Sequence, residues 1–257
     1  MDTFFLGTHR PGWLARMSVP LFVSRRTLVT YKRLPRAAGR WALDSGGFSE
    51  LSMFGAWQTT PEQYVGEVRR YRDEIGGMDW AAAQDWMCEP FMLAKTGLTI
   101  AEHQRRTTDN YARLLDLAPD LPWLPVLQGW RAPEYIAHAE AYERRGLPLR
   151  DRVVGIGSVC RRQREREGYA VVLNIAFATR LQLHGFGVKV TGLRRMAPFL
   201  ASADSLAWSY AGRRAGRHTG CAHASGANCL RFATAWRERV LATVQSGSEQ
   251  QRLPWPS

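Results

Sequence analysis

One short stretch brings a carboxylate, a hydroxyl and two glycines together directly after an apolar lead. The lead is Trp41 to Leu43, and the residues after it are Asp44, Ser45, Gly46, Gly47 and Phe48. An apolar run that breaks into such residues is typical of a buried strand ending in an open loop. The glycines would let a flat ligand approach the backbone beside Asp44. The same residues also make an ordinary turn, and this stretch alone does not separate the two interpretations.

Further polar or glycine-rich residues follow later apolar runs. They are Asp85, Gln128 with Gly129, Gly155 to Ser158 (including Ile156 and Gly157), His184 with Gly185, and Asp204. Each has a simpler interpretation, since Asp85 could cap a helix, Gln128-Gly129 could form a turn and Asp204 could be a loop residue. Their recurrence beside successive runs favours one shared site with three carboxylates, an amide and a glycine-rich segment.

Cysteine and histidine side chains gather near the C-terminus. Cys221, His223 and Cys229, with His218 as a fourth ligand, have the thiolate and imidazole groups that suit tetrahedral zinc. We expect such a zinc to be structural, because none of these residues belongs to the predicted pocket. The alternative is two buried cysteines at the base of the last helix.

The charge of the chain indicates a polyanionic partner. The 257 residues carry a formal net charge of +12, with a pI near 10.2. Lysine and arginine that neutralise phosphates release counterions, which favours nucleic acid as the partner. A proteome rich in arginine for unrelated reasons is the alternative. Candidate phosphate contacts are Arg161, Arg162, Arg213 and Arg214, although such charge runs are also common on solvated faces.

We expect a cytoplasmic protein, in a bacterium or a phage-infected host. No apolar run approaches the roughly 20 residues that a membrane span needs, so no membrane partner is expected. Met1 to Leu6 has no basic region ahead of its apolar residues and does not resemble a secretory signal. The four cysteines are too few and too scattered for a disulfide framework, which favours a reducing compartment.

Apolar runs that could be strands alternate with helical patterns. The predicted strands are Thr3 to Thr8, Pro20 to Ser24, Trp41 to Asp44, Met78 to Asp85, Trp123 to Gln128, Val153 to Val159, Leu181 to Lys189 and Ser205 to Tyr210. Thr60 and Thr99 begin capping boxes of two helices. Further helices are predicted from Pro133 to Ala141, Tyr169 to Arg180, Leu193 to Leu200 and Asn228 to Val244.

Eight strands alternating with helices predict an α/β chain with a parallel sheet, most simply a (β/α)8 TIM barrel. We expect residues 1–257 to form one domain, with a small zinc segment and final helix over 217–246 and a loose tail over 247–257. In such a barrel the active site lies at the C-terminal ends of the strands, where the residues above would meet.

These residues resemble the tRNA-guanine transglycosylase superfamily in sequence order. Asp44 to Phe48 is similar to its Asp-Ser-Gly-Gly-aromatic signature, and Asp85 with Cys88 and Pro90 is similar to its Asp-Glu-Cys-Thr-Pro stretch. The later matches are Val126 to Gly129, Val154 to Ser158, His184 to Gly187, and Asp204 with the basic segment after it. The resemblance extends from Thr3 to about Val240, and the short length most resembles the DpdA-type relatives.

The resemblance implies a role for each residue. Asp204 would attack C1′ of the sugar, and Asp44 would move protons to and from the bases; two carboxylates can exchange a base with retention in this way. Asp85, with Gln128 beside it, would accept hydrogen bonds from the donor edge of guanine, and the backbone of Gly155 to Gly157 would donate to the base carbonyl. Phe48 and His184, which stands where the family has Met, would sandwich the ring. Ser45, Gly46, Gly47, Gly129 and Gly185 would complete the pocket.

The implied reaction exchanges guanine in DNA for a 7-deazaguanine base such as preQ0. The alternatives are the same exchange on tRNA, a non-catalytic nucleic-acid-binding barrel, and a glycoside hydrolase or other small-molecule barrel. The family also has a zinc site near its C-terminus, built from a tighter cysteine cluster than the two cysteines here. The sequence leaves the oligomeric state open, including a homodimer.

Overall fold

The computed structural model describes residues 1–159, 166–216, 220–223 and 225–250. Arg161, Arg162 and His218, three of the predicted site residues, lie outside these ranges, as do residues 251–257.

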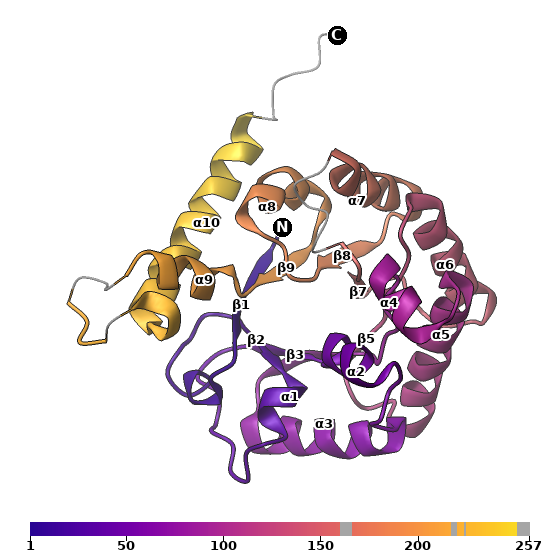
Figure 1. The fold of residues 1–257 in the computed structure, drawn as a ribbon, viewed down its shortest axis with the longest axis horizontal. Coiled ribbons are helices and arrows are strands. Elements are labelled where there is room, and N and C mark those ends of the chain that lie inside the picture. Colours follow the sequence, from indigo (N-terminus) through magenta and orange to yellow (C-terminus); the bar gives the residue numbers. More distant parts are fainter. Residues whose placement is uncertain (160–165, 217–219, 224, 251–257) are drawn as a thin grey trace.

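Nine parallel strands form one sheet at the centre of the molecule (Figure 1). The spatial order is β5-β4-β3-β2-β1-β9-β8-β7-β6. The strands are β1 (Thr3–Thr8), β2 (Leu21–Ser24), β3 (Trp41–Asp44), β4 (Met78–Ala82), β5 (Trp123–Leu124), β6 (Val126–Leu127), β7 (Val153–Ile156), β8 (Gln182–Gly185) and β9 (Ser202–Ser205).

Strands β5 and β6 are two halves of one barrel strand, interrupted only at Pro125. The first half pairs with β4 and the second half pairs with β7. Proline has no N–H to donate, but the Pro125 carbonyl still accepts a hydrogen bond from the Gly155 N–H at 2.8 Å. The two ends of the sheet therefore meet here, and the fold is a TIM-like (β/α)8 barrel, as predicted.

The predicted eighth strand, Ser205 to Tyr210, is wrong. The strand is β9, which pairs with β1 and β8, and residues Ala207–Arg214 form helix α9 instead. Trp208 is buried and Tyr210 is exposed, an alternation that also fits one apolar side of a short helix. Strand β9 is mostly polar, so the search for apolar runs does not identify it as a strand. Asp204 lies inside this strand rather than before it.

Several predicted strands end earlier than expected. Strand β4 stops at Ala82, β7 at Ile156 and β8 at Gly185. The residues after these points are loops at the C-terminal end of the barrel, so Asp85 lies on a loop and not on a strand.

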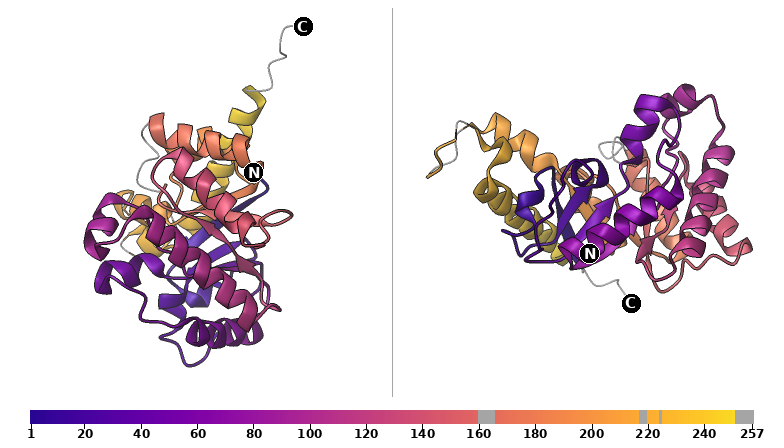
Figure 2. Two further views of the ribbon diagram at one scale, coloured as in Figure 1. Left: turned by 90° about the vertical axis from the view of Figure 1, so that its right-hand side faces the viewer. Right: turned by 90° about the horizontal axis from the view of Figure 1, so that it is seen from below.

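Helices surround the barrel (Figures 1 and 2). They are α1 (Arg25–Leu28), α2 (Gly47–Phe54), α3 (Pro61–Ile75), α4 (Pro90–Thr96), α5 (Ile100–Leu117), α6 (Ala132–Arg144), α7 (Arg166–Thr179), α8 (Val190–Met196), α9 (Ala207–Arg214) and α10 (Leu230–Gln250). The capping box at Thr60 is confirmed. At Thr99 the hydroxyl accepts the Glu102 N–H, while the Glu102 carboxylate pairs with arginines of its own helix.

Helix α10 lies outside the barrel beside β1 and packs against α8 and α9 (Figures 1 and 2). It continues to Gln250, so the predicted loose tail is wrong for residues 247–250. None of the helices in the described residues is long and apolar enough to cross a membrane.

Buried apolar side chains form three clusters, and two of them build the barrel, while the third lies around Leu51 and Trp86. The larger cluster lies between the strands and the surrounding helices and includes Trp41, Tyr64 and Tyr142. The smaller cluster includes Phe5, Trp80 and Val126, and Phe22 and Phe186 pack against it. Alternate side chains along a strand point to opposite faces, so the smaller cluster fills the barrel interior beneath the C-terminal mouth.

Candidate active site

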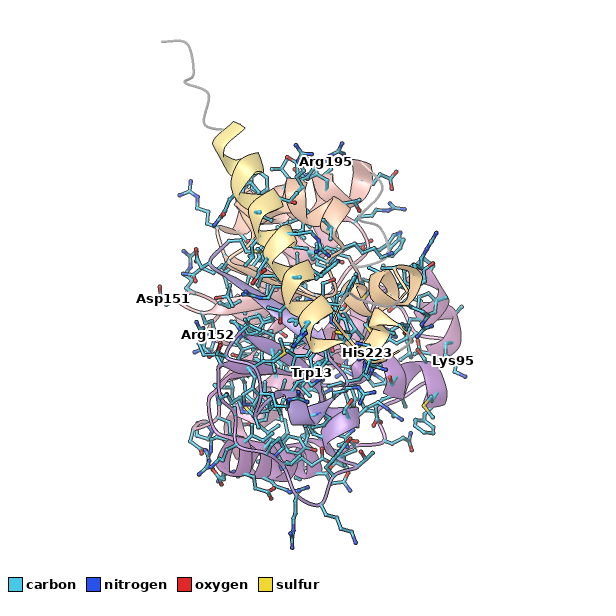
Figure 3. All side chains as sticks on the ribbon, turned by 90° about the vertical axis from the view of Figure 1, so that its left-hand side faces the viewer. Trp13, Lys95, Asp151, Arg152, Arg195 and His223 are labelled. Carbon is cyan, nitrogen blue, oxygen red and sulfur yellow. The ribbon has the colours of Figure 1, made fainter. Side chains whose placement is uncertain are left out.

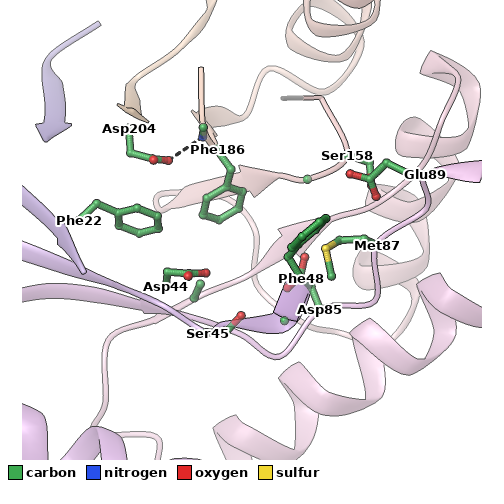
Figure 4. A pocket seen from close by; sticks show the side chains of 14 residues that line it. Phe22, Asp44, Ser45, Phe48, Asp85, Met87, Glu89, Ser158, Phe186 and Asp204 are labelled. Atoms are coloured by element: carbon green, nitrogen blue, oxygen red, sulfur yellow. Dashed lines mark hydrogen bonds between the residues drawn. The ribbon is translucent and has the colours of Figure 1, made fainter. Parts of the chain in front are cut away.

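A cavity of about 230 Å³ opens at the C-terminal ends of the strands (Figure 4). Among the predicted residues, Asp44, Ser45, Gly47, Phe48, Asp85, Gly157 and Asp204 line it. The lining also includes Phe22, Ala82, Met87, Glu89, Ser158, Phe186 and Gly187. The three carboxylates picked out from the sequence therefore do face one space, as the strand ends suggested.

Asp204 is held in place by the backbone of the β8–α8 connection. Its side chain is only 7% exposed, and its Oδ1 accepts the Gly187 N–H at 2.9 Å. The Asp204 carbonyl accepts the Val188 N–H at the same distance. Among the described residues, nothing hydrogen-bonds the second carboxylate oxygen, Oδ2. A carboxylate fixed through one oxygen and open at the other can act as a nucleophile.

Asp44 ends strand β3 at the opposite side of the cavity (Figure 4). Its Oδ1 accepts the Gly46 N–H at 3.1 Å, and Gly46 has the left-handed φ of 78° that this tight turn requires. Burial raises the pKa of Asp44, and the negative charge of Asp204 adds to the rise against hydrogen bonds from Ser24 and Gly46. A carboxyl group with a raised pKa can carry a proton and is suited to acid–base chemistry.

Asp85 lies on the loop after β4 and has a strongly perturbed pKa. Burial raises its pKa to about 7, and nearby Asp44 and Glu89 carboxylates add to the rise. The Gln128 side-chain amide makes a very short hydrogen bond to its Oδ2. Asp85 can therefore switch between a hydrogen-bond acceptor and a protonated donor near neutral pH.

Gln128 stands behind the cavity wall rather than in it. Its side chain is fully buried, and its amide is shared between Asp85 and the Ser158 hydroxyl, whose Oγ lies 2.8 Å from the Gln128 Oε1. A Cβ on Gly157 would collide with this amide. Gln128 thus supports Asp85 from behind, and the glycine at 157 lets the two layers lie against each other.

His184 does not form a wall of the cavity, so its predicted stacking on the base is wrong. It is fully buried in the barrel interior, with its ring 4.8 Å from both Trp80 and Phe186 between centroids. Its Nδ1 lies 2.8 Å from the Ser202 hydroxyl, and its Nε2 lies 3.4 Å from Oδ1 of Asp204. Phe186, two residues later on the same side of the chain, reaches the cavity instead (Figure 4).

Four predicted binding residues lie outside the lining because they serve packing. A Cβ on Gly129, Gly155 or Gly185 would press against Tyr135, Phe186 or Val188, respectively. Ile156 is buried in the cluster between strands and helices.

Glu89, Met87 and Phe186 are cavity residues that the predicted site set does not include, and Ser158 lines the cavity at the end of the predicted glycine-rich segment. Glu89 is 3% exposed, and its Oε2 lies 2.8 Å from the Ser158 hydroxyl. Ser158 has a φ of 57°, which is uncommon for a residue with a side chain. A glutamate directly before Pro90 looks like a simple helix start, so only its position in the fold shows that it faces the cavity.

Arg213 and Arg214 are exposed at the end of α9. The Arg214 guanidinium lies 5.7 Å from the ring centroid of Tyr210, which is itself 63% exposed. These side chains are free to meet a large anionic partner, although neither lines the cavity.

Cys221, His223 and Cys229 form a cluster beside the beginning of α10 (Figure 3). One ligand atom from each lies within 4.8 Å of the others, and the two sulfurs are 3.5 Å apart. Two thiolates on one zinc at about 2.3 Å would be separated by roughly 3.8 Å in a tetrahedral site. The three donors therefore fit a tetrahedral metal with one further ligand.

No curated protein matches the chain. Among solved structures, the HMG-CoA lyase from Brucella melitensis aligns with 98% of this chain and 98% of its own, at 11% identity and a TM-score of 0.48. The family model described as "DpdA: DeoxyPurine in DNA protein A" matches residues 1–253. The chain belongs to the DpdA family.

Proposed function

We propose that this protein exchanges guanine in DNA for a 7-deazaguanine base through a covalent Asp204–deoxyribose intermediate. The observation that carries the proposal is the placement of Asp204 and Asp44 on one cavity that also holds Asp85. Membership of a family named for deoxypurine in DNA supports DNA as the polymer. The net charge of +12 suits such a polyanion.

In the first displacement, Oδ2 of Asp204 attacks C1′ of the target deoxynucleotide. The C1′–N9 bond breaks, and Asp44 gives its proton to the departing guanine. The raised pKa of Asp44 supports this acid role. In the second displacement, Asp44 takes the proton from N9 of the incoming base, N9 attacks C1′, and the bond to Asp204 breaks. Two inversions retain the configuration of the sugar.

Base recognition uses the remaining lining. Ionised Asp85 accepts hydrogen bonds from the N1–H and exocyclic amine of guanine, which a 7-deazaguanine also carries. The rings of Phe48 and Phe186 both turn into the cavity (Figure 4) and offer faces for stacking. The target nucleotide must leave the DNA stack to reach this cavity, and Arg213 and Arg214 would hold phosphates outside it.

The Cys221, His223 and Cys229 cluster would hold a structural zinc. Its donors fit zinc, and none of them lines the cavity. Zinc there would join the segment before α10 to the beginning of that helix, with no part in the exchange.

The direct test supplies isotopically labelled preQ0 and duplex DNA to the purified protein and counts labelled nucleosides by mass spectrometry. Asp204→Asn should lower incorporation at least about 1,000-fold, because the covalent step loses its nucleophile. Asp116→Asn, on the exposed side of α5, is the matched control and should leave incorporation unchanged. Without an incoming base, the wild-type protein should form a denaturation-resistant DNA adduct that Asp204→Asn does not form.

Three other outcomes would each contradict part of the proposal. Equal incorporation by Asp204→Asn and wild type would exclude the assigned nucleophile. Incorporation into tRNA but not DNA would reverse the choice of polymer. Salt-sensitive DNA binding without exchange of any supplied base would leave a non-catalytic binding barrel.

A further inference from the structure

A continuous chain of hydrogen-bonding groups links the two carboxyls at the inner end of the cavity. The Gln128 amide nitrogen faces Asp85, and its Oε1 lies 2.8 Å from the Ser158 hydroxyl. The same hydroxyl lies 2.8 Å from Oε2 of Glu89 and accepts the Cys88 N–H at 2.9 Å. Asp85, Ser158 and Glu89 line the cavity, and Gln128 joins them from behind.

This series of hydrogen-bonding groups needs one proton in addition to the hydrogens of the Gln128 amide and the Ser158 hydroxyl. Ser158 has a single hydroxyl hydrogen, yet it faces acceptor oxygens of both Gln128 and Glu89. If both carboxyls were ionised, one of these two short O···O contacts would contain no hydrogen. A buried contact between two acceptors is costly, so one carboxyl must carry a proton for every contact to be a hydrogen bond.

Two arrangements satisfy every group. With the amide as it stands, Asp85 is an ionised acceptor, Ser158 donates to Gln128, and a protonated Glu89 donates to Ser158. With the amide rotated by a half-turn, a protonated Asp85 donates to Gln128, the amide N–H donates to Ser158, and Ser158 donates to ionised Glu89. The two differ only in the orientation of the Gln128 amide and in which carboxyl holds the proton.

We propose that Asp85 and Glu89 share one proton, and that binding of a base moves this proton to Glu89. The step is a balanced transfer: protonated Asp85 and ionised Glu89 become ionised Asp85 and protonated Glu89. Glu89 is thus a positioning residue, since it keeps Asp85 an acceptor for the donor edge of the base. This inference rests on the proposed function, because it takes Asp85 as the residue that meets that edge.

Among the titratable groups in this region, Asp85 and Glu89 are the two that we propose exchange a proton. In the described residues, the titratable side chains around these hydrogen-bonded groups are Asp44 from β3, Cys88, His103 from α5, and Glu134, His138 and Tyr142 from α6. Burial raises the pKa of Tyr142, which keeps its phenol protonated. Burial takes the pKa of His138 to about 4, so His138 is neutral at pH 6. Burial also lowers the pKa of His103, whose two ring nitrogens already contact the Met87 carbonyl and the Thr96 hydroxyl. Burial raises the pKa of the Cys88 thiol, and Glu134 already accepts two backbone N–H groups.

The raised pKa of Asp85, about 7, fits a proton resting on Asp85 when the cavity is empty. If Asp85 titrated independently of Glu89, it would have to release that proton to solvent when a base binds at pH 6. A shared proton would instead move to Glu89 and stay in the protein. The number of protons released on binding therefore separates the two cases.

The experiment is calorimetric titration of the full-length protein with preQ0 at pH 6, in two buffers of different ionisation enthalpy. We expect wild type to release close to zero protons. Ser158→Ala cuts the connection and should raise the release towards one proton per base. Ser52→Ala removes a buried hydroxyl with no hydrogen-bond partner among the described residues and should behave as wild type.

Glu89→Gln provides a second test, because the proposed role and a merely structural role of Glu89 predict opposite effects on base affinity. The side-chain amide introduced at position 89 would donate permanently to Ser158, as protonated Glu89 does. Affinity at pH 6 should therefore equal or exceed that of wild type, again without proton release. Release of nearly one proton by wild type, or weaker binding by Glu89→Gln at every pH, would overturn the inference while leaving base recognition intact. Absence of base binding by wild type would instead remove the proposed function, and the inference with it.

Discussion

Two carboxyls of the same chemical type have different surroundings in this cavity. Asp204 is fixed by the Gly187 N–H on one oxygen, with the other open towards the cavity. Asp44 is half-buried at the end of β3, where desolvation raises its pKa and the charge of Asp204 adds to the rise. Environment can thus assign a nucleophile and a proton carrier to identical groups, and these different surroundings support the roles proposed for Asp204 and Asp44.

Replacing Phe186 tests which ring stacks on the base. Phe186 lines the cavity where His184 does not, so Phe186→Ala should weaken preQ0 binding about tenfold, within the range of about 1–3 kcal/mol for one base stacked on an aromatic side chain. Calorimetry gives the affinity. Phe177→Ala removes a 69% exposed phenylalanine from α7 and should leave it unchanged. Equal affinity for the two variants would remove Phe186 from the site.

Asp85 should make the protein less stable as pH rises. Its pKa of about 7 in the folded state, raised mainly by burial, lies above the value near 3.9 for an unfolded chain. The folded state therefore holds a proton that the unfolded state has released, and the resulting stabilisation is present below about pH 4 and lost as pH rises through 7.

Asp85→Asn removes this titration, because the amide stays neutral. Between pH 5 and 8, the wild-type free energy of unfolding should fall by about 2–3 kcal/mol relative to that of Asp85→Asn. Urea unfolding at several pH values measures the difference. Curves that run parallel for the two proteins would show that Asp85 does not titrate in this range.

At the scale of elements, a buried ion cluster positions the helix that follows Asp44. The Arg25 guanidinium of α1 binds Glu50 of α2 at 3.0 Å and Glu67 of α3 at 2.6 Å. The second oxygen of Glu50 accepts the Gln58 N–H at 2.8 Å. Because α2 begins at Gly47, this cluster fixes the loop that carries Ser45 and the wall that carries Phe48.

Glu50→Gln should lower the free energy of unfolding by about 3 kcal/mol, since it leaves a buried arginine with one carboxylate fewer. Chemical denaturation measures the loss. Glu74→Gln breaks an exposed pair with Arg70 on α3 and should cost much less, because water screens the attraction between exposed charges. Similar losses for the two variants would mean that the Arg25 cluster does not stabilise the fold.

The sequence predicts the alternation of strands and helices well, because apolar runs and capping residues are local signals. It misplaces the eighth strand, since Ser202–Ser205 is polar and the apolar residues after it belong to α9. It also predicts that the His184 ring stacks on the base, whereas this ring is buried in the barrel interior below the cavity. His184 lies in β8 and Phe186 directly follows that strand, with their rings 4.8 Å apart between centroids, and only the layering of the barrel decides which of them reaches the mouth. Glu89 and Ser158 join through a loop contact 69 residues apart in sequence, which no local pattern contains.

At the scale of the whole molecule, the chain ends are joined by α10. Its Arg237 guanidinium donates two hydrogen bonds to the Phe4 carbonyl of β1, at 3.1 and 3.0 Å. The ring of Trp236 lies 6.1 Å from that of Phe4 between centroids. The cysteine and histidine cluster lies at the beginning of this helix, so a metal there would stabilise the packing of α10 on the barrel and take no part in the chemistry.

Removal of the metal should therefore weaken the fold without changing the cavity. Elemental analysis should find about one zinc per chain, and Cys229→Ser should lose it together with several degrees of melting temperature, because a ligand-bound folded state is stabilised by mass action. Base binding at a temperature where the variant stays folded should match wild type, since none of the three donors lines the cavity. Cys88→Ser, which alters a buried cysteine outside the cluster, should retain the zinc. A zinc-free wild-type protein with unchanged melting on chelation would show that Cys221 and Cys229 are ordinary buried thiols, and α10 would then be held by its packing against β1, α8 and α9 alone.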